Sequence, residues 1–154
     1  MKTFNYFENL NSVINKLDYK VFDKCASVIV NYINKKNKIM SCGNGGSATT
    51  ASHYITDWVK MAMTQKNKKI DAICLSDNIG MLTAYANDIS YDSVFSEQVK
   101  SYGKSEDLLI CVSGSGNSKN LLKAVDVAKT NLIKTMAIVG YDGGELIKKC
   151  DYIV

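Results

Sequence analysis

Residues 38–48 read KIMSCGNGGSA, a short apolar run that leads directly into three glycines and a serine. A continuous apolar run of this length is typical of a strand buried on both faces of a parallel sheet. The glycines permit positive φ and let a ligand approach the backbone closely. A helical pattern follows over residues 47–62, with Ser47 placed at its N-cap, where free N–H groups favour an anion. An ordinary strand-to-helix turn has the same appearance, so this stretch by itself predicts a strand–loop–helix unit and not yet a site.

The same unit recurs to the end of the chain. Short apolar runs predict strands at residues 38–42, 70–75, 108–112, 135–139 and 152–154. Helical patterns lie between them at 47–62, 78–86, 92–102, 118–130 and 144–149, and two more precede them at 3–17 and 21–33. This alternation predicts the α/β fold class, with a single doubly wound, five-stranded parallel sheet flanked by helices. Residues 1–154 are interpreted as one domain, in which residues 1–36 form an N-terminal helical part.

A second glycine-rich loop follows the third predicted strand. Residues 112–120 read VSGSGNSKN, with three serines in six positions at the start of a helix. The hydroxyls of Ser113, Ser115 and Ser118, together with the first amides of that helix, can surround the oxygens of a phosphate. A flexible turn capped by a serine is the alternative. Because the carboxyl ends of parallel strands meet at one sheet edge, where ligands of open α/β sheets bind, both glycine loops are predicted to face one anion.

Composition excludes several classes of function. With 46% hydrophobic and 22% charged residues in 154, the chain has the balance of one globular domain, with neither a membrane span nor a secretion signal. Five cysteines without a CxxC pair indicate a reduced, cytoplasmic protein. The net charge of +4 comes from lysines spread along the chain, so no nucleic-acid partner is expected. Because arginine is absent, a bound phosphate must be held by backbone N–H groups, hydroxyls and lysine.

The two loops together carry a specific resemblance. The segments CGNGGSA (42–48) and SGSGNS (113–118) resemble the sugar isomerase (SIS) domain, and within it the phosphoheptose isomerases. Supporting matches are ASH at 51–53, AND at 86–88, VFSEQV at 94–99 and CD at 150–151. The likeness runs from about residue 5 to 154, and it implies a flavodoxin-like fold. It implies that the sugar is contacted by Asn44, Gly45, Gly46, Asn87 and Asp88, with Ser47 also in the substrate site, and that the phosphate is held by Ser113, Gly114, Ser115 and Ser118.

His53 is the only histidine, and Asp57 lies four residues further along the same predicted helix. Both side chains therefore project from one helical face, which suits zinc binding or acid–base catalysis, although a surface hydrogen bond is the simpler account of the spacing alone. The resemblance implies that both residues bind zinc and act in catalysis. It also implies glutamate at position 57, and aspartate draws the carboxylate back by about 1.5 Å. In that family a glutamine and a histidine on a further C-terminal helix complete the metal site, and that helix is missing from residues 1–154.

The resemblance implies an aldose–ketose isomerase that interconverts sedoheptulose 7-phosphate and D-glycero-D-manno-heptose 7-phosphate, for bacterial lipopolysaccharide or capsule. The alternative is a non-catalytic SIS protein that binds a phosphosugar as a regulator or acts in replication initiation. An apolar stripe along residues 3–17 has no evident partner within the chain and predicts self-association. The family likeness makes that assembly a homotetramer with sugar sites at subunit interfaces.

Overall fold

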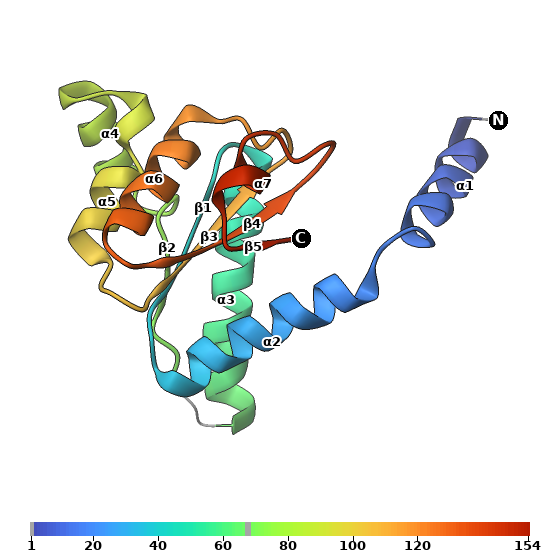
Figure 1. The fold of residues 1–154 in the computed structure, drawn as a ribbon, viewed down its shortest axis with the longest axis horizontal. Helices are drawn as coiled ribbons and strands as arrows, with labels where there is room; N and C mark the ends of the chain where they lie inside the picture. Colours follow the sequence, from blue (N-terminus) through green and yellow to red (C-terminus); the bar gives the residue numbers. More distant parts are fainter. Residues whose placement is uncertain (1, 67–68) are drawn as a thin grey trace.

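The computed structural model describes residues 2–66 and 69–154 and contains one parallel five-stranded sheet (Figure 1). Its strands are β1 (Ile39–Gly43), β2 (Ala72–Cys74), β3 (Leu108–Ser113), β4 (Lys134–Val139) and β5 (Tyr152–Ile153). Their order is β2-β1-β3-β4-β5, with every neighbouring pair parallel. This is the flavodoxin-like order, so the predicted fold class is confirmed. Each strand falls on one of the predicted apolar runs.

Seven α-helices and one short 3₁₀ helix accompany the sheet in the described part of the chain. They are α1 (Lys2–Ile14), α2 (Tyr19–Lys35), α3 (Gly46–Lys66), α4 (Ile79–Asp88), η1 (Tyr91–Ser93), α5 (Ser96–Tyr102), α6 (Lys119–Thr130) and α7 (Leu146–Lys149). No helix among the described residues has the length and apolarity needed to cross a membrane.

Two local predictions were wrong. The single helix expected over residues 92–102 is divided into η1 and α5, because the hydroxyls of Ser90 and Ser93 bond to each other at 2.9 Å and close a tight turn before α5 begins. Ser47 is not the N-cap of α3, since its N–H already donates to the carbonyl of Asn44 at 3.0 Å. The helix therefore begins one residue earlier, at Gly46.

The sheet is covered on both faces, which explains why its strands are continuously apolar. Alternate side chains of a strand point to opposite faces. On β3, Leu108 and Ile110 pack with Cys25 of α2 and Ile55 of α3. The intervening residue Leu109 packs on the other face, in a cluster built with α5, α6 and α7. The middle strands β1 and β3 are buried along their whole length, and each buried leucine or isoleucine stabilises the fold by about 1.5–3 kcal/mol.

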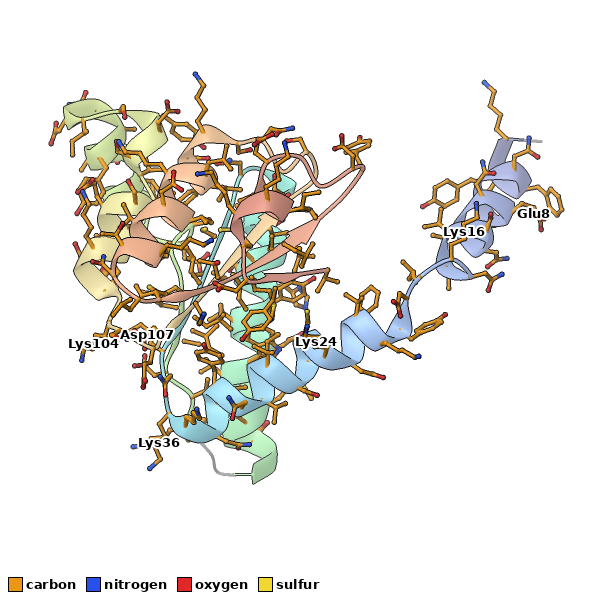
Figure 2. All side chains as sticks on the ribbon, viewed as in Figure 1. Glu8, Lys16, Lys24, Lys36, Lys104 and Asp107 are labelled. Atoms are coloured by element: carbon orange, nitrogen blue, oxygen red, sulfur yellow. The ribbon has the colours of Figure 1, made fainter. Side chains whose placement is uncertain are left out.

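The carboxyl ends of the strands meet at the upper edge of the sheet in Figure 1, where β1 turns into α3 and β3 leads to α6. Gly43 at the end of β1 pairs in register with Val112 of β3. The chain leaves β1 towards β2 on one side and leaves β3 towards β4 on the other, so this point is the topological switch of the sheet. Figure 2 shows Lys104 and Asp107 at the opposite edge. Both predicted ligand loops therefore lie at the edge where such folds bind ligands.

The first helix stands apart from this body. Figure 1 shows α1 projecting away from the sheet at the far end of α2, and Figure 2 shows Glu8 and Lys16 on this projecting segment. Phe4 is 60% exposed and Phe7 is 56% exposed, and no residue of α1 is buried. By contrast, α2 is anchored on the sheet through Cys25. The apolar stripe of α1 thus has no partner within the described residues.

Candidate functional site: an anion loop at the switch point

The loop after β3 combines three serines with the start of α6. Ser113 is buried, and its Oγ accepts the N–H of Gly116 at 3.0 Å. The Oγ of Ser115 accepts the N–H of Asn117 at 3.3 Å. Ser118 is the N-cap of α6, but its hydroxyl makes no capping hydrogen bond. Within the described chain, the hydroxyl protons of Ser113 and Ser115 and the whole hydroxyl of Ser118 are therefore free for a ligand.

The helix that follows adds backbone donors to the same loop. The N–H of Leu121, which donates to the carbonyl of Ser118 at 3.0 Å, is the first in α6 to reach an intrahelical acceptor. The amides that precede it belong to the first turn, where the helix dipole favours negative charge. An anion above Ser118 would meet amides, hydroxyls and the positive end of the helix without any arginine.

A third segment, residues 140–146, supports the loop from the side and was missed in the sequence. Gly116 and Gly143 have φ of +66° and +77°, and a β-carbon on Gly116 would lie 1.9 Å from the carbonyl oxygen of Gly143. Leu146 donates its N–H to the carbonyl of Gly116 at 3.0 Å, and Glu145 donates to Oδ1 of Asn117 at 2.9 Å. The paired glycines of YDGGE were the available signal.

Asn44 of the first loop is held by two side chains from distant parts of the chain. Its Oδ1 accepts from the Tyr91 hydroxyl at 2.9 Å and from Nδ2 of Asn120 at 2.8 Å, while its own Nδ2 donates to Oδ1 of Asn120 at 2.9 Å. Neither Tyr91 nor Asn120 was predicted as a site residue. Gly45 and Gly46 are exposed beside Asn44, and Ser47 is half-buried.

Asn87 and Asp88 occupy the last two positions of α4 and are exposed. Asn87 donates from Nδ2 to the carboxylate of Asp88 at 2.8 Å, and no hydrogen bond of the described residues ties either of them to the serine loop. Their connection to the site is indirect. Tyr91, three residues after Asp88, is the side chain that bonds to Asn44.

His53 and Asp57 meet on the outer face of α3, with Nε2 3.1 Å from Oδ2. Their side chains are 73% and 52% exposed, and His53 lies seven residues, about 10 Å of helix, beyond Gly46. The structure therefore brings the pair together but not to the serine loop.

The donor types and spacing of this pair fit half of a zinc site. Two ligands of a tetrahedral zinc, each about 2.0–2.1 Å from the metal, lie about 3.3 Å apart. No group of three or more His, Cys, Asp or Glu residues suited to a metal occurs among the residues described here.

Two thiols lie directly behind the loops, on neighbouring strands. The Sγ atoms of Cys42 and Cys111 are 3.7 Å apart, and both residues are fully buried. The hydrogen bond with Cys42, added to burial, raises the pKa of the Cys111 thiol well above its ordinary value. Cys111 therefore stays protonated and packs as an apolar side chain, so the polar groups that this edge offers to a ligand are hydroxyls and amides.

A parallel α/β sheet with a serine-rich loop and a helix N-terminus at its switch point places this chain in the doubly wound class, in which such loops commonly bind phosphate groups. Comparison with known families narrows this class. The model of the SIS domain matches residues 4–140, and the chain belongs to the SIS domain family.

Relatives and solved structures agree with this membership. The chain is 41% identical over 127 residues to the phosphoheptose isomerase of Thermodesulfovibrio yellowstonii, covering 82% of this chain and 63% of that protein. It is 42% identical over 119 residues to that of Helicobacter pylori (strain P12), covering 77% and 62%. It thus spans about three-fifths of the length of these curated relatives.

Two solved structures share the fold over almost the whole chain. The phosphoheptose isomerase from Neisseria gonorrhoeae superposes with a TM-score of 0.88 at 30% identity, covering 99% of this chain and 80% of that one. The enzyme from Francisella tularensis gives 0.90 at 26% identity, covering 99% and 82%.

Proposed function

We propose that this chain carries the activity of a phosphoheptose isomerase, an aldose–ketose isomerase that interconverts sedoheptulose 7-phosphate and D-glycero-D-manno-heptose 7-phosphate. The observation that carries the proposal is the serine loop at the α6 N-terminus, within a chain about 40% identical to proteins of that name. The product would serve bacterial lipopolysaccharide or capsule synthesis.

The serine loop would anchor the phosphate end of the sugar. Ser113, Ser115 and Ser118 supply hydroxyl protons, and the first amides of α6 supply backbone donors at the positive end of the helix dipole. A phosphate held there fixes the position of the far end of the sugar. The reacting carbons are then presented to the catalytic groups in one orientation, which lowers the entropic part of the barrier.

The chemical step needs a base, and Asp57 is the proposed one. Its carboxylate would take the proton from the carbon next to the carbonyl, which leaves an enediolate, and would return that proton to the former carbonyl carbon, while a proton passes from the neighbouring hydroxyl to the former carbonyl oxygen. His53 lies 3.1 Å away and can hold the carboxylate in place or exchange a proton with the sugar hydroxyl. Both positions are about half or more exposed in the single chain, so water must be excluded by something outside it.

In this proposal a second copy of the chain excludes water from His53 and Asp57. The exposed stripe of α1 supports assembly into a homotetramer, and a neighbouring subunit over the outer face of α3 would enclose the His53–Asp57 pair. The five cysteines are all free thiols, which supports a reducing, cytoplasmic setting for the assembly.

Zinc is the proposed cofactor, with His53 and Asp57 as two of its ligands. The spacing of the two donor atoms supports this role. A zinc ion bound there would polarise the sugar oxygens. Metal analysis of the protein purified from zinc-supplemented medium tests the assignment, because the His53→Ala variant should lose zinc while the Ser118→Ala variant keeps it.

The activity is tested by incubating the protein with sedoheptulose 7-phosphate and zinc and following the aldose by NMR. We expect conversion by the wild-type chain and a loss of at least about 100-fold in the Asp57→Asn variant, which removes the base and keeps the shape. Binding of the sugar phosphate without conversion would contradict the enzyme and favour a non-catalytic phosphosugar-binding regulator.

A further inference from the structure

The carboxamide of Asn44 is almost completely engaged within the protein. Its Oδ1 accepts two hydrogen bonds, from the hydroxyl of Tyr91 and from the amide of Asn120, and its Nδ2 donates one back to Asn120. All three lie between 2.8 and 2.9 Å. An amide oxygen has two lone pairs and an amide nitrogen two hydrogens. One hydrogen of Nδ2 is therefore the single polar function of this side chain that has no partner among the described residues.

These hydrogen bonds also decide whether the side chain of Asn44 donates to a ligand or accepts from it. With both lone pairs of Oδ1 occupied, Asn44 cannot accept from a ligand and can only donate. Asn44 is half-buried at the carboxyl end of β1, so its remaining hydrogen lies at the edge of the sheet where the serine loop opens. An oxygen of a bound ligand is the complementary group.

The two partners come from the other two segments that border this edge. Asn120 is 2% exposed in the first turn of α6, two residues after Ser118, and Tyr91 begins η1, just after the Asn87–Asp88 segment. Asn120 is buried, and both the amide nitrogen and the amide oxygen of its side chain bond to Asn44. Two hydrogen bonds between the same two side chains fix their relative position. The position of Asn44 is thereby tied to the start of the helix that would hold the phosphate.

We infer that Tyr91 and Asn120 are positioning residues, which hold Asn44 as a one-hydrogen donor to a sugar oxygen at a set distance from the phosphate. The inference rests on the proposed function, since it takes a sugar phosphate as the ligand. Tyr91 is 58% exposed, so its ring contributes little to the core, and the role is carried by its hydroxyl.

The Tyr91→Phe variant removes that hydroxyl and little else. A matched control is Tyr102→Phe, because the hydroxyl of Tyr102 donates to Sδ of Met81 at 3.1 Å, in the packing of α5 against α4. In steady-state isomerisation of sedoheptulose 7-phosphate, we expect Tyr91→Phe to raise KM about three- to tenfold with kcat within about twofold. Tyr102→Phe should leave both constants at wild-type values.

A double-mutant cycle separates positioning from direct contact. If Tyr91 acts through Asn44, adding Tyr91→Phe to Asn44→Ala should change KM no further. Additive effects would show that Tyr91 contacts the substrate itself and would overturn the inference, as would an unchanged KM in Tyr91→Phe alone. No conversion by the wild-type chain would instead overturn the proposed function, and the positioning role with it.

Discussion

At the scale of single residues, the serines of the loop after β3 differ in what their hydroxyls already do. Ser118 makes no hydrogen bond through its side chain, whereas Ser113 is buried and accepts the N–H of Gly116. Ser118→Ala should therefore weaken sugar-phosphate binding several-fold, the equivalent of about 0.5–1.5 kcal/mol, at unchanged stability. Ser113→Ala should weaken binding and also lower the free energy of unfolding by about 1 kcal/mol. Titration calorimetry measures binding and urea unfolding measures stability. Equal losses of stability in Ser113→Ala and Ser118→Ala would contradict the different roles of the two hydroxyls.

Glycine is required at position 116 for two separate reasons. Its φ is +66°, and a β-carbon would overlap the carbonyl of Gly143. Gly45 has a similar φ of +54° but open space around the same point. Gly45→Ala should lower the free energy of unfolding by about 1–2 kcal/mol, because alanine disfavours this backbone conformation. Gly116→Ala should lower it by more than about 3 kcal/mol, because the 140–146 segment must also move. Urea unfolding of both variants measures the two losses in the free energy of unfolding. Similar losses would show that the loop at Gly116 does not pack tightly against the 140–146 segment.

At the scale of elements, one carboxylate reinforces the backbone pairing of β5 with β4. Oδ2 of Asp151 accepts from the N–H and the hydroxyl of Thr135 at 2.9 and 2.8 Å, and Oδ1 accepts from Lys134 at 3.0 Å. Partial burial works to raise the pKa of Asp151, but these hydrogen bonds outweigh it and hold the pKa below its ordinary value. The ionised form is therefore the one that stabilises the β4–β5 pair.

The sign of the pH dependence follows from that lowered pKa. The contribution of Asp151 is fully present above the ordinary carboxyl pKa of about 4 and is lost as pH falls through the lower folded value. Asp151→Asn should lower the free energy of unfolding at neutral pH by about 1–2 kcal/mol and flatten its decline below about pH 4. Urea unfolding at a series of pH values measures this. The control is Asp71→Asn, because Asp71 is an exposed carboxylate whose ion-pair partner among the described residues is Lys38.

At the scale of the whole molecule, α1 has no buried residue, and unlike α4, which also has none, it contributes no side chain to the core clusters of the described residues. Its exposed aromatic residues, Phe4 and Phe7, form an apolar surface of the kind that interfaces cover, so we expect other copies of the chain to cover it. Phe4→Ser with Phe7→Ser should convert the assembly to a species of the 17.0 kDa chain mass, without loss of folded secondary structure. Ile79→Ser, which changes an even more exposed apolar residue on α4, should leave the assembly intact.

Light scattering coupled to gel filtration reports the mass, and circular dichroism reports the fold. If the assembly encloses the His53–Asp57 pair, isomerase activity should fall together with the mass in the Phe4/Phe7 double variant. A wild-type protein that is already monomeric and fully active would contradict both the assembly and the shared site.

Local pattern was sufficient for the fold class. The continuous apolar runs identified all five strands, and the glycines and serines after β1 and β3 marked the loops at the ligand edge. These features depend on neighbours along the chain: the period of burial, the freedom of glycine, and the need for polar groups where a helix begins. The break within residues 92–102 was invisible because it depends on the hydroxyl pair of Ser90 and Ser93, which forms only in the folded turn.

The amino-acid sequence by itself therefore determined the strands, the helices between them and the composition of the two glycine-rich loops, because hydrophobic period and turn chemistry act over a few residues. Tertiary structure alone decided which groups meet across that loop. Asn44 forms hydrogen bonds with Asn120, 76 positions away in the sequence, and with Tyr91, 47 positions away. Gly116 lies against Gly143 only because β3 and β4 are neighbouring strands. Such pairs depend on strand register and helix placement, which bring together side chains that no local pattern connects.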